Sequence, residues 1–283
     1  MNLLLAQGDA ASVNWFDFIF SPDRWDWLFT GRSFTFILEG LAVNLEMAAI
    51  AMILSLILGL FLALGRLSKN PLVSKTSGLW VDVWRNLPLI FILLYLSLAL
   101  PNNVKDWWED SAPGFLPEAF QSGQIAAAIV GLTLYNSAVI AEIMRAGIQS
   151  LERGQGEAAA ALGLTYWKSM RLVILPQGLR RMVPATVSQL ITLNKDTTLA
   201  FIIGFQDVGR HGRILASCQP FTCGTTIPFL QVFLVIGLLF IIVNFILSRL
   251  SRRLEIRQRE RTGVVIERAT GLEDQVAAEA DVA

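Results

Sequence analysis

The sequence has few charged residues, only two cysteines and a single histidine. Charged residues make up 16% of the 283 residues, whereas soluble domains carry about 25%. This composition excludes an ordinary soluble enzyme and a disordered protein. The small number of Cys and His residues excludes a disulfide-dense secreted domain and a multi-histidine, cysteine-rich zinc or iron–sulfur site, so we expect no metal. The 23 basic residues are balanced by 23 acidic ones, and we expect no nucleic-acid partner.

Apolar residues, by contrast, make up 54% of the chain and occur in long runs. Residues 47–65 contain no charge, and a helix of this length crosses a hydrocarbon core of about 30 Å. The runs predict an all-α polytopic membrane protein and argue against an outer-membrane barrel, whose strands alternate. We expect about five transmembrane helices, roughly at 45–65 (after an amphipathic segment at 34–44), 79–100, 124–144, 183–206 and 227–248.

Lys and Arg are distributed unequally between the alternate loops, with 17 on one side and 5 on the other. Cytoplasmic loops carry the excess of basic residues. We therefore predict that the N-terminus lies outside and the C-terminus in the cytoplasm, which agrees with an odd number of spans.

Three regions follow from the composition. Residues 1–32 form an outer amphipathic extension, in which Trp residues beside charges suit the headgroup level, although a loosely packed extension fits equally well. Residues 33–250 form the transmembrane domain, with an outer loop at 102–123 that holds one short surface helix. Residues 251–283 form a cytoplasmic tail that is first basic, suiting the anionic inner leaflet, and then disordered.

The cytoplasmic loop at 148–181 has a defined pattern. Residues 157–162 are helix formers with an acidic residue in the first turn, and Gly163 stands where a left-handed residue would end the helix. A second amphipathic piece, residues 166–175, should stop at Pro176. We therefore predict a small, Ala-faced helical knob that exposes Glu157 to a basic group of a partner.

The loop resembles the cytoplasmic signature of ABC importer permeases. That signature reads Glu-Ala-Ala, three residues, Gly, nine residues, Ile-x-Leu-Pro, and here Val173 replaces Ile. The frame around it is similar to the polar amino-acid branch of these permeases, over about residues 33–250. The matching segments are Glu157-Ala158-Ala159, Gly163, Val173-Ile174-Leu175-Pro176, Arg85–Pro88, Ala141–Ile148, Gly154–Glu157 and Asn194–Leu199. Asn44 and Thr198 depart from the usual Thr and Ser.

The resemblance implies a permease subunit for polar amino acids in the bacterial inner membrane. Its loop residues Glu157, Ala158, Ala159, Gly163 and Pro176 would couple it to a cytoplasmic ABC ATPase dimer. A second permease subunit, identical or sister, and an extracytoplasmic binding protein would complete the assembly. The chain has no G-x-x-x-x-G-K-[ST] phosphate loop, so it cannot be that ATPase, and we expect it not to be an enzyme. ATP and Mg²⁺ belong to the partner, and no cofactor is expected in this chain.

Lys195 and Asp196 interrupt the least apolar of the predicted spans. Adjacent residues on a helix do not face each other, so the pair cannot neutralise itself. Asp196 would lie about 18 Å along a helix that begins near Pro184. These charges and the polar residues on the same helix faces either line the translocation path or lock the bundle by pairing with Glu142, Arg145 or another helix. The candidate path residues are Ser188, Gln189, Thr192, Lys195 and Asp196.

Three further expectations concern particular side chains. Glu142 and Arg145 suit a local ion pair at the membrane boundary. Cys218 and Cys223 lie five residues apart in an outer loop, where a disulfide is allowed but two free or buried thiols are the alternative. His211 suits a surface loop.

Two other functions stay open on the sequence alone. An ion-gradient-driven secondary transporter or channel often shows internal repeats with broken helices, and we find no repeat. A membrane anchor without transport would gain nothing from the charges in the fourth span.

Overall fold

A computed structural model of the chain describes residues 19–29, 31–114, 116, 118–151, 153–217 and 228–262. Every regular element in this part of the chain is a helix, which confirms the all-α prediction. Cys218, Cys223 and the distal tail lie outside the described residues. The elements are η1 Pro22–Arg24, α2 Asp26–Phe29, α3 Ser33–Arg66, α4 Pro71–Asn86, α5 Leu89–Ala99, α6 Asn102–Ser111, η2 Glu118–Gln121, α7 Gly123–Gln149, α8 Arg153–Ala161, α9 Tyr166–Ser169, η3 Met170–Ile174, α10 Leu175–Asp196, η4 Thr197–Ile203, α11 Val208–Ala216 and α13 Phe229–Thr262.

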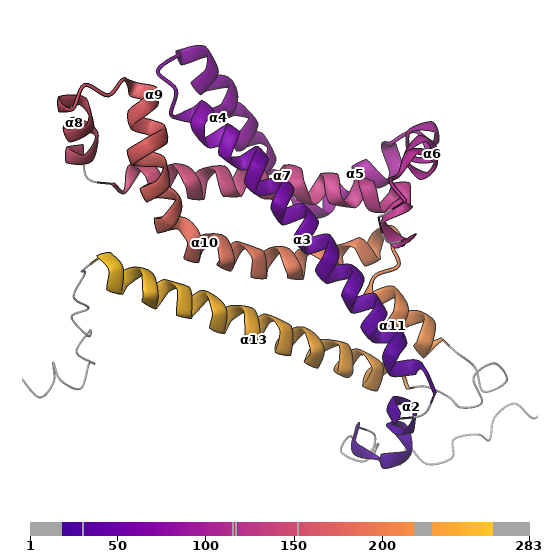
Figure 1. The fold of residues 1–283 in the computed structure, drawn as a ribbon. Helices are drawn as coiled ribbons and strands as arrows, with labels where there is room; N and C mark the ends of the chain where they lie inside the picture. The colour runs from indigo at the N-terminus through magenta and orange to yellow at the C-terminus, as the bar shows by residue number, and fades with distance from the viewer. Residues whose placement is uncertain are drawn as a thin grey trace, which may run out of the picture.

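Helix α7 is the centre of the bundle and packs against α3, α4, α5, α6 and α10. Helix α3 crosses it (Figure 1), and small residues allow the close approach. A Cβ atom on Gly59 of α3 would lie only 2.7 Å from Ile140 Cγ2 and 3.0 Å from the Ser137 carbonyl oxygen of α7. Glycine is therefore required where these two helices touch.

Helices α3, α7 and α13 are each long and apolar enough to cross a membrane. The first predicted span and its amphipathic lead-in form one continuous helix, Ser33–Arg66. The last span also continues without a break into the basic segment, as α13. At 1.5 Å per residue its 34 residues measure about 51 Å, so part of α13 must project beyond the hydrocarbon core.

The prediction of a single helix at 79–100 is wrong. This region forms α4 and α5, which are bent by 95° relative to each other and count as a fourth span only if they are taken together. Leu87 is extended, with ψ 131°, and Pro88 precedes α5. A proline disfavours the helical conformation of the residue before it and cannot donate to a helical hydrogen bond, which explains the break.

The fourth predicted span begins earlier than expected and is not among the helices apolar enough to pass for a span by themselves. Pro176 does not stop the preceding helix, because α9 runs through the π-helical turn η3 directly into α10. Pro176 lies in the first turn of α10, where a missing N–H costs little, and the wide π turn separates its ring from the preceding backbone. Pro184 is inside α10, so it does not mark the start of this helix.

His211 is also placed differently from the prediction. It is buried on α11 and its ring centroid lies 4.3 Å from that of Phe36 on α3. The expected outer loop therefore contains a packed helix. The short surface helix expected in the other outer loop is present as α6. In the N-terminal extension, Trp27 is buried in a cluster with Ile37 and Leu41 of α3, which contradicts loose packing for α2.

Candidate functional site

The predicted coupling helix is present as α8 and ends as its sequence requires. Gly163 has φ +74°, the left-handed conformation that glycine adopts without a steric penalty. The N–H of Gly163 donates to the Ala160 carbonyl oxygen at 2.9 Å, and the N–H of Leu164 donates to the Ala159 carbonyl oxygen at 3.1 Å. These two hydrogen bonds form a Schellman motif, which satisfies the last carbonyl groups of the helix. The helix begins at Arg153, four residues before the predicted start.

The outer face of α8 is open to solvent. Glu157 and Ala158 are exposed, whereas Ala159 is buried, so the Glu-Ala-Ala triplet has one side toward the protein and one side free. Two large apolar side chains that follow the triplet in the chain are also exposed. Leu162 is 81% exposed and Trp167 is 70% exposed. Exposed apolar side chains next to an exposed charge are typical of a docking surface.

The loop is attached to the bundle on two sides. Tyr166 donates its hydroxyl hydrogen to the Leu67 carbonyl oxygen at 3.2 Å, and the ammonium group of Lys69 lies 4.9 Å from the centre of the Tyr166 ring. On the other side, Arg181 of α10 donates to the Ser150 carbonyl oxygen at 2.6 Å. These contacts join the loop to the α3–α4 connection and to α10.

The five candidate path residues all lie on the second half of α10, but in different environments. Ser188, Thr192 and Lys195 are exposed, and Asp196 is half-buried. Among the described residues, neither Lys195 nor Asp196 forms an ion pair. Gln189 instead donates from Nε2 to Asn136 Oδ1 of α7 at 2.8 Å, which fixes α10 against the central helix.

Three further polar contacts between helices were not predicted. Asn194 Nδ2 of α10 donates to Asn244 Oδ1 of α13 at 3.2 Å. Asn44 of α3 is fully buried, donates from Nδ2 to Thr197 Oγ1 at 3.0 Å and accepts the Val208 N–H at 2.9 Å. The only sequence signal for these contacts is an amide residue within an apolar run.

Asp207 occupies the N-cap of α11 and is fully buried. Its Oδ1 accepts the Arg210 N–H at 2.9 Å, while its Oδ2 has no hydrogen-bond partner among the described residues. Burial disfavours the ionised carboxyl and raises the pKa of Asp207 to about 6.

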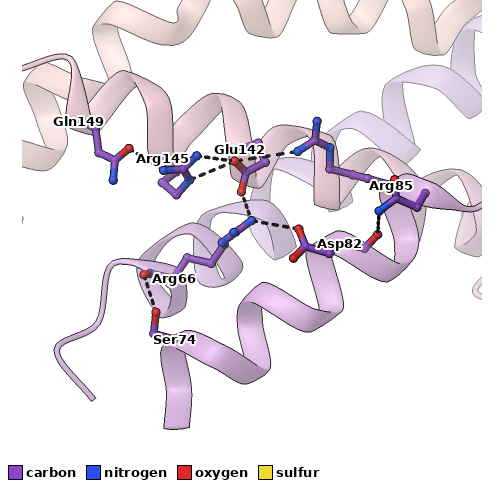
Figure 2. Close-up of polar contacts among 8 residues, drawn as sticks. Arg66, Ser74, Asp82, Arg85, Glu142, Arg145 and Gln149 are labelled. Atoms are coloured by element: carbon purple, nitrogen blue, oxygen red, sulfur yellow. Dashed lines mark hydrogen bonds and ion pairs between the residues drawn. The ribbon is translucent and has the colours of Figure 1, made fainter. Parts of the chain in front are cut away.

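A charged cluster joins α3, α4 and α7 at the end of the bundle nearest the coupling loop (Figure 2). Glu142 accepts hydrogen bonds from Arg145, with Nη2 to Oε2 at 2.8 Å, as the i, i+3 spacing predicted. It also pairs with Arg66 of α3 and lies 4.0 Å from Arg85 of α4. Arg66 lies 3.6 Å from Asp82. One carboxylate therefore holds three helices, and neither Lys195 nor Asp196 takes part.

In the described part of the chain, no group of three or more His, Cys, Asp or Glu residues could hold a metal ion.

Comparisons with known proteins show the family of the chain. The family described as "Binding-protein-dependent transport system inner membrane component" matches residues 55–260. The "Probable glutamine ABC transporter permease protein GlnP" of Bacillus subtilis is 37% identical over 223 residues, covering 79% of this chain and 94% of that protein. The "Arginine transport system permease protein ArtQ" of the same species is 33% identical, covering 78% and 91%.

Solved structures have the same fold. A chain of an amino acid ABC transporter crystallised with histidines aligns with a TM-score of 0.63 and 27% identity, covering 79% of this chain and 94% of the other. An inward-facing MetNI methionine ABC transporter chain aligns with a TM-score of 0.57 at 19% identity, a likeness of fold alone.

Proposed function

Because the chain belongs to the family of binding-protein-dependent transport system inner membrane components, we propose that it forms the path for polar amino acids in an ATP-driven importer. The observation that carries this proposal is the exposed coupling helix α8, joined to the bundle through Tyr166 and Arg181. ATP hydrolysis belongs to a cytoplasmic ATPase dimer. An identical or sister permease and an external binding protein complete the assembly, with the N-terminus of this chain outside and its C-terminus in the cytoplasm.

Coupling would act through one helical rod. Residues 166–196 run without a break from the base of the knob through η3 to Asp196, so a displacement at Tyr166 reaches the path residues. The twenty residues from Pro176 to Asp196 span about 30 Å. ATP binding would close the ATPases and pull α8, turning the path from inward- to outward-facing, and hydrolysis would reset it.

We further propose that Asp196 contributes to the path rather than to a structural lock. A lock requires a partner charge on another helix, and among the described residues Asp196 forms no ion pair. A half-buried carboxylate without a cationic partner is suited to accept the ammonium group of an amino acid. Lys195, exposed beside it, offers the opposite charge for the carboxylate of the same substrate.

The coupling proposal is tested by co-purification of the ATPase subunit with variants of the knob. Glu157→Lys reverses the exposed charge, and Gly163→Pro removes both the positive φ and the N–H of the Schellman motif. We expect each variant to insert normally into the membrane. The amount of ATPase that co-purifies should fall at least tenfold, which corresponds to a loss of about 1.4 kcal/mol in docking free energy. Amino-acid uptake should fall in parallel.

Two matched substitutions serve as controls. Asp110→Lys makes the same charge reversal at an exposed position of α6, and Gly163→Asn keeps a residue that tolerates the left-handed conformation. Both should retain the ATPase. Wild-type ATPase content and full uptake in Glu157→Lys and Gly163→Pro would show that α8 is only a connector.

A further inference from the structure

A cavity of about 480 Å³ lies beside the charged cluster, between α4 and the neighbouring ends of α3 and α7. Its lining includes three cations, Arg66, Lys75 and Arg145, but only one carboxylate, Asp82. The Glu142 carboxylate behind this wall is already shared among three arginines. Counting Glu142 and Arg85 with the lining, four cations face two carboxylates, so the region has an excess of about two positive charges at neutral pH.

Part of this excess comes from Lys75 of α4. Lys75 is exposed and forms no ion pair with any residue that the structure describes. Arg145 donates from Nη1 to Gln149 Oε1 at 2.6 Å, and the hydroxyl group of Ser74, also in the lining, donates to the Arg66 carbonyl oxygen at 3.0 Å. Cationic side chains around one opening provide the chemistry that binds a phosphate group.

An exposed apolar stripe runs along α4 away from this opening. Leu79 lines the cavity and is 66% exposed. Val83, one turn further along α4, is 46% exposed, and Leu87, the first residue after α4, is 42% exposed. Trp80 beside them is also exposed. The stripe leads from the cation-lined cavity toward the apolar helix α5, as acyl chains would descend from a headgroup into the bilayer.

We propose that this cavity binds the headgroup phosphate of an anionic phospholipid, with the acyl chains lying along Leu79, Val83 and Leu87. The site is at the bundle end that carries the coupling loop, where the basic loops also lie. Anionic lipids are attracted to such basic segments. The lipid would thereby hold α4 next to the Leu67 connection on which Tyr166 rests.

The test measures lipid binding to the assembled transporter, with ATPase and both permeases present, by native mass spectrometry after delipidation. Short-chain phosphatidylglycerol, phosphatidylcholine and inorganic phosphate are titrated separately. We expect one phosphatidylglycerol per copy of this chain, with at least fivefold preference over phosphatidylcholine and no competition from equimolar inorganic phosphate. This readout does not depend on transport, so the proposed function and the lipid site can fail separately.

Two variants assign the binding to the cavity. Lys75→Gln removes an exposed cation that holds no partner, and we expect about fivefold weaker binding. Gly78→Leu places a side chain in the cavity, since a Cβ at Gly78 meets only Arg66, at 3.8 Å, and it should abolish binding. Gly78→Ala, which fits that space, is its control. Arg253→Gln makes the same charge change as Lys75→Gln at an exposed position of α13 and should bind as the wild type does.

Three results would overturn the proposal. Equal losses in Lys75→Gln and Arg253→Gln would reduce the effect to general charge attraction. Displacement by inorganic phosphate at equal concentration would leave an anion site that is not a lipid site. Absence of phosphatidylglycerol from the assembled transporter would mean that a protein partner covers the cavity.

Discussion

Asp196 and Asp207 are both carboxyl groups at helix ends that are at least half-buried, but they have different surroundings. Asp207 caps α11 and is fully enclosed by packed helices. Asp196 ends α10, is only half-buried and has the exposed Lys195 next to it. A fully enclosed carboxyl is suited to a structural role, whereas one that is reached by solvent can exchange partners. The two residues therefore call for different measurements.

Asp196→Asn keeps the shape and hydrogen bonding of the side chain but removes its charge. If Asp196 meets the ammonium group of the substrate, we expect uptake to fall at least tenfold while the yield of assembled complex stays normal. A structural lock would instead leave a cation without its partner, at a cost of about 3–5 kcal/mol, and the yield would fall. Uptake and yield are measured on the same preparations. Normal values of both would make Asp196 a solvated bystander.

Asp207 should make stability depend on pH. Its pKa is about 6 in the folded protein and near 3.8 when exposed, so between these values the folded state holds a proton that the unfolded state has lost. Stability should therefore fall as the pH rises from about 4 to about 6, by at most about 3 kcal/mol, and then level off. Asp207→Asn retains a good N-cap and should remove this component.

Thermal unfolding of the purified protein at pH 4.5, 6 and 7.5 checks the dependence on Asp207. The slope that differs between wild type and Asp207→Asn isolates this residue from other titrating groups. Parallel pH profiles for the two proteins would show that the Asp207 carboxyl is not the group responsible.

At the scale of helices, the bundle is held by a few polar contacts between apolar surfaces. Asn44, Gln189 and Asn194 each reach from one helix to another. Glu142 does more, because it contacts arginines from α3, α4 and its own helix α7 (Figure 2). Apolar helices have little hydrophobic reason to choose one neighbour in lipid, so such contacts determine which faces meet.

Glu142→Gln tests this cluster. Removal of the carboxylate leaves three guanidinium groups facing one another with only Asp82 nearby. We therefore expect the free energy of unfolding to fall by about 3 kcal/mol. This is the low end of the range for a broken buried ion pair, because Glu142 retains some exposure. Asp82→Asn is the matched control. Its side chain is 60% exposed, so its loss should cost less than about 1 kcal/mol. Thermal unfolding measures both, and equal losses would show that Glu142 has no special position.

At the scale of the whole molecule, the chain belongs to a family of transport system components rather than complete transporters. Large apolar side chains remain exposed along α3, α5 and α13, including Phe61, Tyr95 and Phe245. Lipid and a second permease subunit would cover such surfaces. The exposed knob α8 lies at one end of the same bundle (Figure 1), where a soluble partner can reach it.

The energy source distinguishes this assembly from a gradient-driven transporter. In vesicles that contain the full assembly, we expect uptake to stop when internal ATP is depleted and to continue when an uncoupler collapses the proton gradient. The experiment with the uncoupler must be run with ATP held constant, because a loss of ATP would itself stop uptake and would look like dependence on the proton gradient. Uptake that follows the proton gradient at constant ATP would contradict an ATP-driven importer.

The sequence by itself determined the features that depend on local chemistry. Apolar runs defined α3, α7 and α13, and Gly163 identified the left-handed end of α8. The Glu142–Arg145 pair followed from helical spacing alone. The order of the segments around Glu157 and Gly163 also indicated the family, because the matching motif is contiguous along the chain.

The tertiary structure decided what depends on residues far apart in sequence. Arg66 and Arg85 reach Glu142 only after α3 and α4 fold back on α7, and Asn44 meets Thr197 across 153 positions. His211 is polar and its segment is short, yet packing against Phe36 buries it. Pro176 ends a helix in isolation but here begins α10, since the π turn before it accommodates the ring. Hydropathy and helical spacing describe one segment at a time, whereas these placements result from contacts between segments.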